Sequence, residues 1–78
     1  MAVSEFALDP ETSDLVTTAF NKSWQFVRTD PELAHNDVNA MRARLSHLIT
    51  RLAEGGERDV WRLANSAIGQ LRRERNAA

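Results

Sequence analysis

The most constraining feature of the sequence is a stripe of apolar residues between Val38 and Leu52 that recurs at spacings of three and four. Its members are Val38, Met41, Leu45, Leu48, Ile49 and Leu52, and Gly55-Gly56 follows. This spacing places the apolar side chains on one face of an α-helix, and the glycines favour the end of that helix. Such a face has to be buried, so other amphipathic segments must cover it.

Two further amphipathic helices are predicted, one on each side of this stripe. Asp9-Pro10-Glu11 is a strong helix start, and the first helix is expected to run to about Val27. The third is expected to begin at Asp59, acting as its cap, and to run to about Glu74. The apolar positions expected in the core are Leu15, Val16, Ala19, Phe20, Trp24 and Val27 in the first helix, and Val60, Trp61, Ala64, Ala67, Ile68 and Leu71 in the third. Both tryptophans are therefore expected to pack in the core, and the less favoured alternative is that the edge of one tryptophan is exposed to a partner.

Residues 31–36 have two interpretations. The start signal is repeated at Asp30-Pro31-Glu32, so one helix could run from Pro31. Alternatively, a short turn precedes a second helix that begins near Asn36. We favour the turn, because Asn36 and Asp37 are better helix caps than helix-interior residues.

The predicted architecture is an all-α, antiparallel three-helix bundle with short connections. The helical domain is expected to cover residues 9–74, preceded by a flexible segment at 1–8 and followed by a frayed end at 75–78. A chain of 78 residues buries only about 60% of the surface that its unfolded form exposes. We therefore expect no enclosed pocket of about 300 Å³ or more.

No recognisable catalytic or cofactor chemistry is present in the sequence. Cysteine is absent, so neither a disulfide nor a thiolate metal site is available. The two histidines, His35 and His47, lack metal-ligand spacing, and Gly55-Gly56 lacks the lysine of a phosphate-binding loop. Ser46 and His47 are neighbours on a helix and point about 100° apart, so they do not form a nucleophile–base pair. We expect no enzyme activity, no cofactor and no metal.

The sequence also predicts a cytoplasmic location without membrane association. Its apolar runs are much shorter than the ~18 residues of a membrane-spanning helix. The first residues carry Glu5 and Asp9 and have no basic segment before an apolar one, which is unlike a signal peptide.

Charge is divided unevenly along the chain. Residues 1–37 carry seven carboxylates and two basic side chains, whereas the rest of the chain carries eight arginines and four carboxylates. The two parts can complement each other within the bundle, which we favour, or the basic part can face a partner. Arg44 and Arg51 flank the central stripe and are expected to reach carboxylates such as Glu11 or Asp14.

The exposed face of the third helix is the candidate interaction surface, and its members are basic or small. They are Arg58, Arg62, Ser66, Gly69, Arg72 and Arg73. A helix-interior glycine costs about 1 kcal/mol relative to alanine, so we hypothesise that it permits close approach of another helix, in a second copy or a protein partner. The alternative is nucleic-acid binding through the arginines, although a pI near 6.1 is low for that class of protein.

One segment carries a resemblance to a known group of proteins. Leu48–Asp59 reads LITRLAEGGERD and is followed by Arg62-Leu63-Ala64 and Ala67-Ile68. This resembles short uncharacterised helical proteins of alphaproteobacteria, especially rhizobia, in which a GERD turn joins two amphipathic helices. Asp9-Pro10-Glu11 and the aromatic pair Phe20 and Trp24 look like the start of their first helix. The resemblance implies a bacterial, cytoplasmic protein with no assigned activity. The expected function is that of a small interaction or regulatory module.

Overall fold

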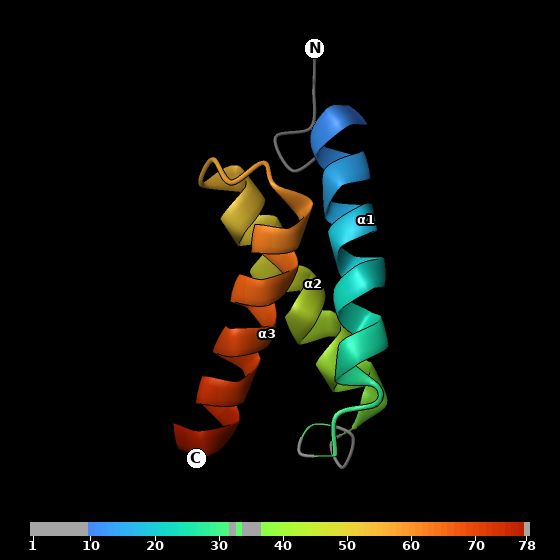
Figure 1. Cartoon of the computed structure of the whole chain (residues 1–78), viewed down its shortest axis with the longest axis vertical. Coiled ribbons are helices and arrows are strands. Elements are labelled where there is room, and N and C mark those ends of the chain that lie inside the picture. The colour runs from blue at the N-terminus through green and yellow to red at the C-terminus, as the bar shows by residue number, and fades with distance from the viewer. Residues whose placement is uncertain (1–9, 32, 34–36, 78) are drawn as a thin grey trace.

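The computed structural model of the chain describes residues 10–31, 33 and 37–77 as three α-helices joined by short connections. These are α1 (Pro10–Val27), α2 (Val38–Glu54) and α3 (Val60–Ala77). Each helix packs against both of the others. Figure 1 shows that α2 runs antiparallel to α1 and to α3. The predicted all-α three-helix bundle is confirmed.

The predicted limits of the helical domain can be compared with the structure only in part. The expected flexible segment at 1–8 lies outside the described residues, as does Asp9, the predicted cap of α1. The first helix begins at Pro10, as the start signal Asp9-Pro10-Glu11 predicted. The last helix continues to Ala77, past the predicted end, and the expected fraying of 75–78 stays a prediction.

A turn, and not a continuous helix, connects α1 to α2. The N–H of Leu33 donates to the C=O of Asp30 at 3.1 Å. The Asp37 carboxylate then caps α2 by accepting from the N–H groups of Asn39 and Ala40 at 2.9 and 3.3 Å. Because these N–H groups have no partner within the helix, the cap fixes where α2 starts. The alternative of one helix running from Pro31 is therefore wrong, because Leu33 lies in a turn and α2 begins at Val38. Residues 32 and 34–36 of the predicted turn, with the cap candidate Asn36, lie outside the described residues.

The α2–α3 turn starts at a glycine with a left-handed backbone. Gly56 has a φ of 113°, and its N–H donates to the C=O of Ala53 at 3.1 Å. The N–H of Glu57 donates to the C=O of Leu52 at 3.2 Å. This pair of hydrogen bonds is a Schellman motif, which satisfies the last carbonyl groups of the helix. The glycine break therefore ends α2 as predicted.

Carboxylates hold the rest of this turn. A single Glu57 oxygen, Oε2, accepts from the N–H groups of Arg58 and Asp59, both at 3.1 Å. The Asp59 carboxylate accepts from the N–H of Arg62 at 3.0 Å, which confirms Asp59 as the cap of α3. The start of α3 is thus fixed by side chains from the turn itself.

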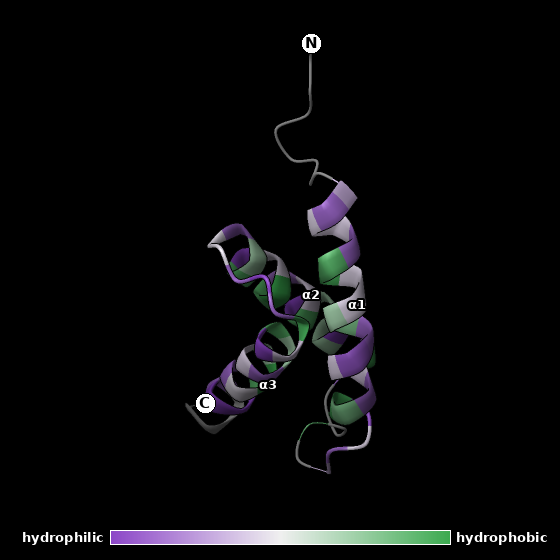
Figure 2. Ribbon diagram, turned by 45° about the horizontal axis from the view of Figure 1, so that its top comes forward, coloured by the Kyte–Doolittle hydropathy of each residue, from purple (hydrophilic) through white to green (hydrophobic). Residues whose placement is uncertain are grey.

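The core lies where the apolar faces of the three helices meet (Figure 2). Its buried members are Val16, Ala19, Val27, Leu33, Leu45, Leu48, Ile49, Ala53, Leu63, Ala67 and Leu71. Three of them, Leu33, Ala53 and Leu63, were missed from the sequence. Leu33 lies in a turn, and Leu63 belongs to the same face of α3 as Ala67.

Two predicted core residues are exposed instead. Trp61 is 53% exposed and Val38 is 56% exposed. Leu63 is completely buried, so the core face of α3 is centred near Leu63 and Ala67. Residue 61 is two positions before Leu63, or about 200° away around the helix, so its indole points away from the side of α3 that Leu63 buries. Val38 is the first residue of α2, where few neighbours are available to cover it.

Small and hydroxyl-bearing side chains allow α1 to pack closely. Ser23 is completely buried, and its hydroxyl donates to the C=O of Ala19 in the preceding turn at 2.8 Å. Thr12 is 6% exposed and accepts a hydrogen bond from Arg58. Each buried hydroxyl therefore has a partner, which removes the cost of burying it.

Candidate interaction surface

The structure separates the six predicted surface residues into two groups. Arg62, Ser66, Gly69 and Arg73 follow one another along the solvent side of α3, and we call them the arginine row. Apart from the half-buried Gly69, they are exposed. The remaining two, Arg58 and Arg72, point toward α1 and its C-terminal turn, as their partners there show.

Both arginines that turn toward α1 have partners within the fold. The guanidinium of Arg58 donates to the Thr12 hydroxyl at 2.9 Å. The Nε of Arg72 donates to Asp30 Oδ2 at 3.1 Å, and the side chain of Asp30 is only 10% exposed. The Arg72–Asp30 ion pair joins the basic part of the chain to the acidic part, as the charge distribution predicted, whereas the partner of Arg58 is a neutral hydroxyl. Among the α3 side chains that the structure describes, the arginines that face outward are thus Arg62 and Arg73.

Gly69 creates open space within the arginine row. A Cβ atom added there would meet nothing within 4 Å, so the position is not required for packing within the bundle. Backbone at such a position can be approached closely by another chain. This is the geometry that the hypothesis of a close helix contact needs.

Two large aromatic side chains are exposed on the pair of helices α1 and α3, which pack against each other. Phe26 on α1 is 58% exposed and Trp61 on α3 is 53% exposed. The ammonium group of Lys22 lies 4.9 Å from the centroid of the Trp61 ring, in a cation–π contact between the two helices. Lys22 and Phe26 are one turn apart on α1, so they lie on the same face.

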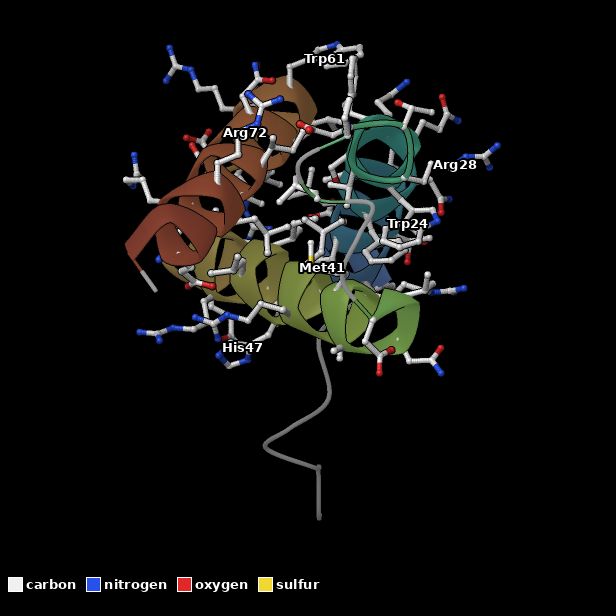
Figure 3. All side chains as sticks on the ribbon, turned by 90° about the horizontal axis from the view of Figure 1, so that it is seen from below. Trp24, Arg28, Met41, His47, Trp61 and Arg72 are labelled. Carbon is white, nitrogen blue, oxygen red and sulfur yellow. The ribbon has the colours of Figure 1, made fainter. Side chains whose placement is uncertain are left out.

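An open groove continues this surface toward the end of α1. It has a volume of about 570 Å³ and is lined by Phe26, Thr29, Asp30, Pro31 and Arg72. Its lining thus includes both the Arg72–Asp30 ion pair and the Phe26 ring. We call the surface formed by Lys22, Phe26, Trp61 and Arg72 the α1–α3 face. Figure 3 shows Trp61 and Arg72 on the same side of the molecule, opposite His47.

The other aromatic residues of α1 are covered by the fold. Phe20 and Trp24 are half-buried, stack with ring centroids 6.0 Å apart and pack against the core. The Arg42 guanidinium of α2 lies 6.0 and 5.7 Å from their centroids. The predicted core position of Trp24 is thus correct in part. Among the aromatic residues that the structure describes, Phe26 and Trp61 are therefore the most exposed to a partner.

The pairing predicted for Arg44 is wrong. Instead of reaching Glu11 or Asp14 on α1, Arg44 binds Glu74 of α3, with Nε 3.0 Å from Oε1. The hydrogen bond to Arg44 lowers the pKa of Glu74 and raises that of Arg44. Arg44 and Arg51 lie on the α3 side of α2, where they line an open groove of about 240 Å³ with Leu48, Leu52 and Gln70.

Two kinds of feature were sought in the described part of the chain, namely metal-binding clusters and membrane-spanning helices. Among these residues, no group of three or more histidine, cysteine, aspartate or glutamate side chains could hold a metal ion. None of the helices over residues 10–27, 38–54 and 60–77 is long and apolar enough to cross a membrane. The sequence missed the α1–α3 face because periodicity placed Trp61 in the core. The signal available in the sequence was Phe26, which lies outside the apolar stripe of the first helix and so could have been predicted to be exposed.

Comparison of the chain with models of protein families, with curated proteins and with solved structures finds no match. The function is therefore inferred from the surface itself.

Proposed function

We propose that this protein is a small interaction module that binds a protein partner through the α1–α3 face. The observation that carries the proposal is the pair of exposed aromatic side chains, Phe26 and Trp61, on adjoining helices. Aromatic residues supply much of the binding free energy at protein interfaces, because each can bury ~150–250 Å² on association.

The surroundings of these rings also suit a protein partner. Lys22 and Arg72 flank them, and both cations are held by contacts within the fold. Preorganised side chains lose less conformational entropy when a partner binds. Polar groups around an aromatic centre are the usual arrangement of an interface.

Nucleic-acid binding, the alternative from the sequence, has less support from this geometry. Of the four predicted arginines, Arg58 donates to Thr12 and Arg72 donates to Asp30. Their guanidinium groups would have to exchange these partners for phosphates. Two outward-facing arginines on α3 give a weaker phosphate-binding surface than the full set.

The proposal is tested by isolating the tagged protein from cells that express it naturally, beside a Phe26→Ala/Trp61→Ala variant. Val38→Ala is the control, because Val38 is a similarly exposed apolar residue on α2. We expect a defined partner with the parent and the control, and a loss of about tenfold or more with the double variant. The urea midpoint of the double variant should stay near that of the parent, because exposed side chains contribute little to folding. Equal partner recovery by all three proteins would contradict the proposal.

A further inference from the structure

We infer that the partner segment is an acidic amphipathic helix, which lies along α3 with its apolar side on Trp61 and Phe26. This inference rests on the proposed function and identifies the chemistry of the partner.

The charges around the aromatic rings favour an acidic partner. Between its cap and Arg73, α3 contains no carboxylate, while Arg62, Arg72 and Arg73 are all exposed. The next acidic residue, Glu74, is bound to Arg44 at the α2 side. Across the seam, Lys22 adds a further positive charge. Opposite charges around an apolar centre steer a partner and fix its orientation.

The nearby carboxylates do not cancel this positive charge. Asp30 is largely covered and already bound by Arg72. Asp59, at the start of α3, accepts from the N–H of Arg62 as part of the helix cap. These carboxylates keep their charge, but Lys22, Arg62, Arg72 and Arg73 outnumber Asp30 and Asp59, so the surface presented to a partner is net positive.

The shape of the surface favours a helix as the partner. From Arg62 to Arg73 the arginine row extends for about 17 Å at 1.5 Å per residue, which is about three helical turns. Its central members, Ser66 and Gly69, are small, and the space above Gly69 is open. A second helix could therefore approach between the two arginines, while its apolar side chains at spacings of three and four reach the aromatic rings.

A second copy of this chain fits the same face less well. A symmetric dimer would bring Arg62, Arg73 and Lys22 of one copy against the same cations of the other. Like charges that meet at an interface oppose association. A partner that supplies carboxylates avoids this repulsion.

The test uses a synthetic helical peptide of about four turns, with leucines at i, i+3 and i+7 and glutamates on both flanks. Its charge-inverted control has lysine in place of every glutamate. Binding to the full chain is followed by backbone amide chemical shifts and, in a Trp24→Phe variant, by fluorescence of Trp61. We expect the acidic peptide to shift resonances of the α1–α3 face and the arginine row. The double variant Arg62→Glu/Arg73→Glu should weaken the affinity for the acidic peptide about tenfold or more. The matched variant Arg62→Lys/Arg73→Lys keeps both charges and should weaken this affinity much less.

Other outcomes would overturn the inference in different ways. Equal affinity for the acidic and the lysine peptide would show that charge does not select the partner. Tighter binding of duplex DNA at the same residues would identify a nucleic-acid partner, and a mass that doubles with concentration, lost in Trp61→Ala, would identify a second copy. If no peptide binds, but the tagged parent protein recovers a natural partner that the Phe26→Ala/Trp61→Ala variant loses, this inference fails and the proposed function stands. If the tagged parent protein recovers no partner either, both this inference and the proposed function fail.

Discussion

The guanidinium of Arg58 donates a hydrogen bond to the hydroxyl of Thr12 at 2.9 Å, and this joins the α2–α3 turn to the first turns of α1. Thr12 is buried, whereas Arg58 is exposed in the turn. The contact is the described side-chain hydrogen bond that connects residues farthest apart along the chain. It helps to fix where α3 starts relative to α1.

A double-mutant cycle on Thr12→Val and Arg58→Ala measures this connection. We expect each single variant to lower the free energy of unfolding, with a coupling between them of about 1 kcal/mol, because a partly exposed hydrogen bond is being lost. Urea unfolding at neutral pH provides the measurement. Arg62→Ala serves as the control for removing an exposed arginine from this region, and it should show no coupling to Thr12→Val. Additive effects of Thr12→Val and Arg58→Ala would show that the contact does not connect the turn to α1.

The glycines in α3 and in the turn should respond in opposite ways to alanine. Gly69→Ala should raise the free energy of unfolding by about 1 kcal/mol, because alanine favours the helix and its Cβ meets nothing within 4 Å. Gly56→Ala should lower it by roughly 1 kcal/mol or more, because φ is 113° there. Thermal unfolding of the two variants beside the parent measures both effects. A destabilised Gly69→Ala variant would mean that the open space is occupied by something else in solution.

The Arg44–Glu74 pair predicts a loss of stability in acid. The hydrogen bond to Arg44 lowers the pKa of Glu74, so folding favours the ionised carboxylate. The stabilisation is therefore complete above the ordinary glutamate value of 4.5 and is lost as the pH falls below it through the lowered folded value. Arg44, whose pKa is raised, stays charged throughout this range.

This pH dependence is measured by the difference in urea midpoint between the parent and Glu74→Gln. The difference should be small at pH 7, because both side chains are exposed, and should shrink further below pH 4.5 and at high salt. Glu54→Gln on α2 is the matched control and should show no such trend. A difference that grows as the pH falls would have the wrong sign for this pair.

Much of the fold could be predicted because local signals agreed with the tertiary structure. Asp37, Gly56 and Asp59 set the ends of helices through hydrogen bonds to nearby backbone groups, so their roles can be read from the sequence. The apolar period of α2 likewise identified Leu45, Leu48 and Ile49 as core residues.

The surface could not be predicted to the same extent, because it depends on how the helices are rotated against one another. Trp61 fits an apolar stripe when α3 is considered alone, but Leu63 occupies the core and leaves the indole exposed. Arg72 was predicted on the open face of α3, yet it reaches Asp30 beyond the end of α1. Contacts between residues 42 positions apart have no local signature in one sequence.

The central claim is that the α1–α3 face binds a protein, and site-specific photo-crosslinking in the cells that naturally make this protein tests it most directly. A benzoylphenylalanine residue would replace Trp61 in one variant, and His47, exposed on the opposite side, in the control. We predict a discrete adduct with a different protein from position 61, absent from position 47. The absence of an adduct at position 61, or the same adducts from both positions, would contradict the account.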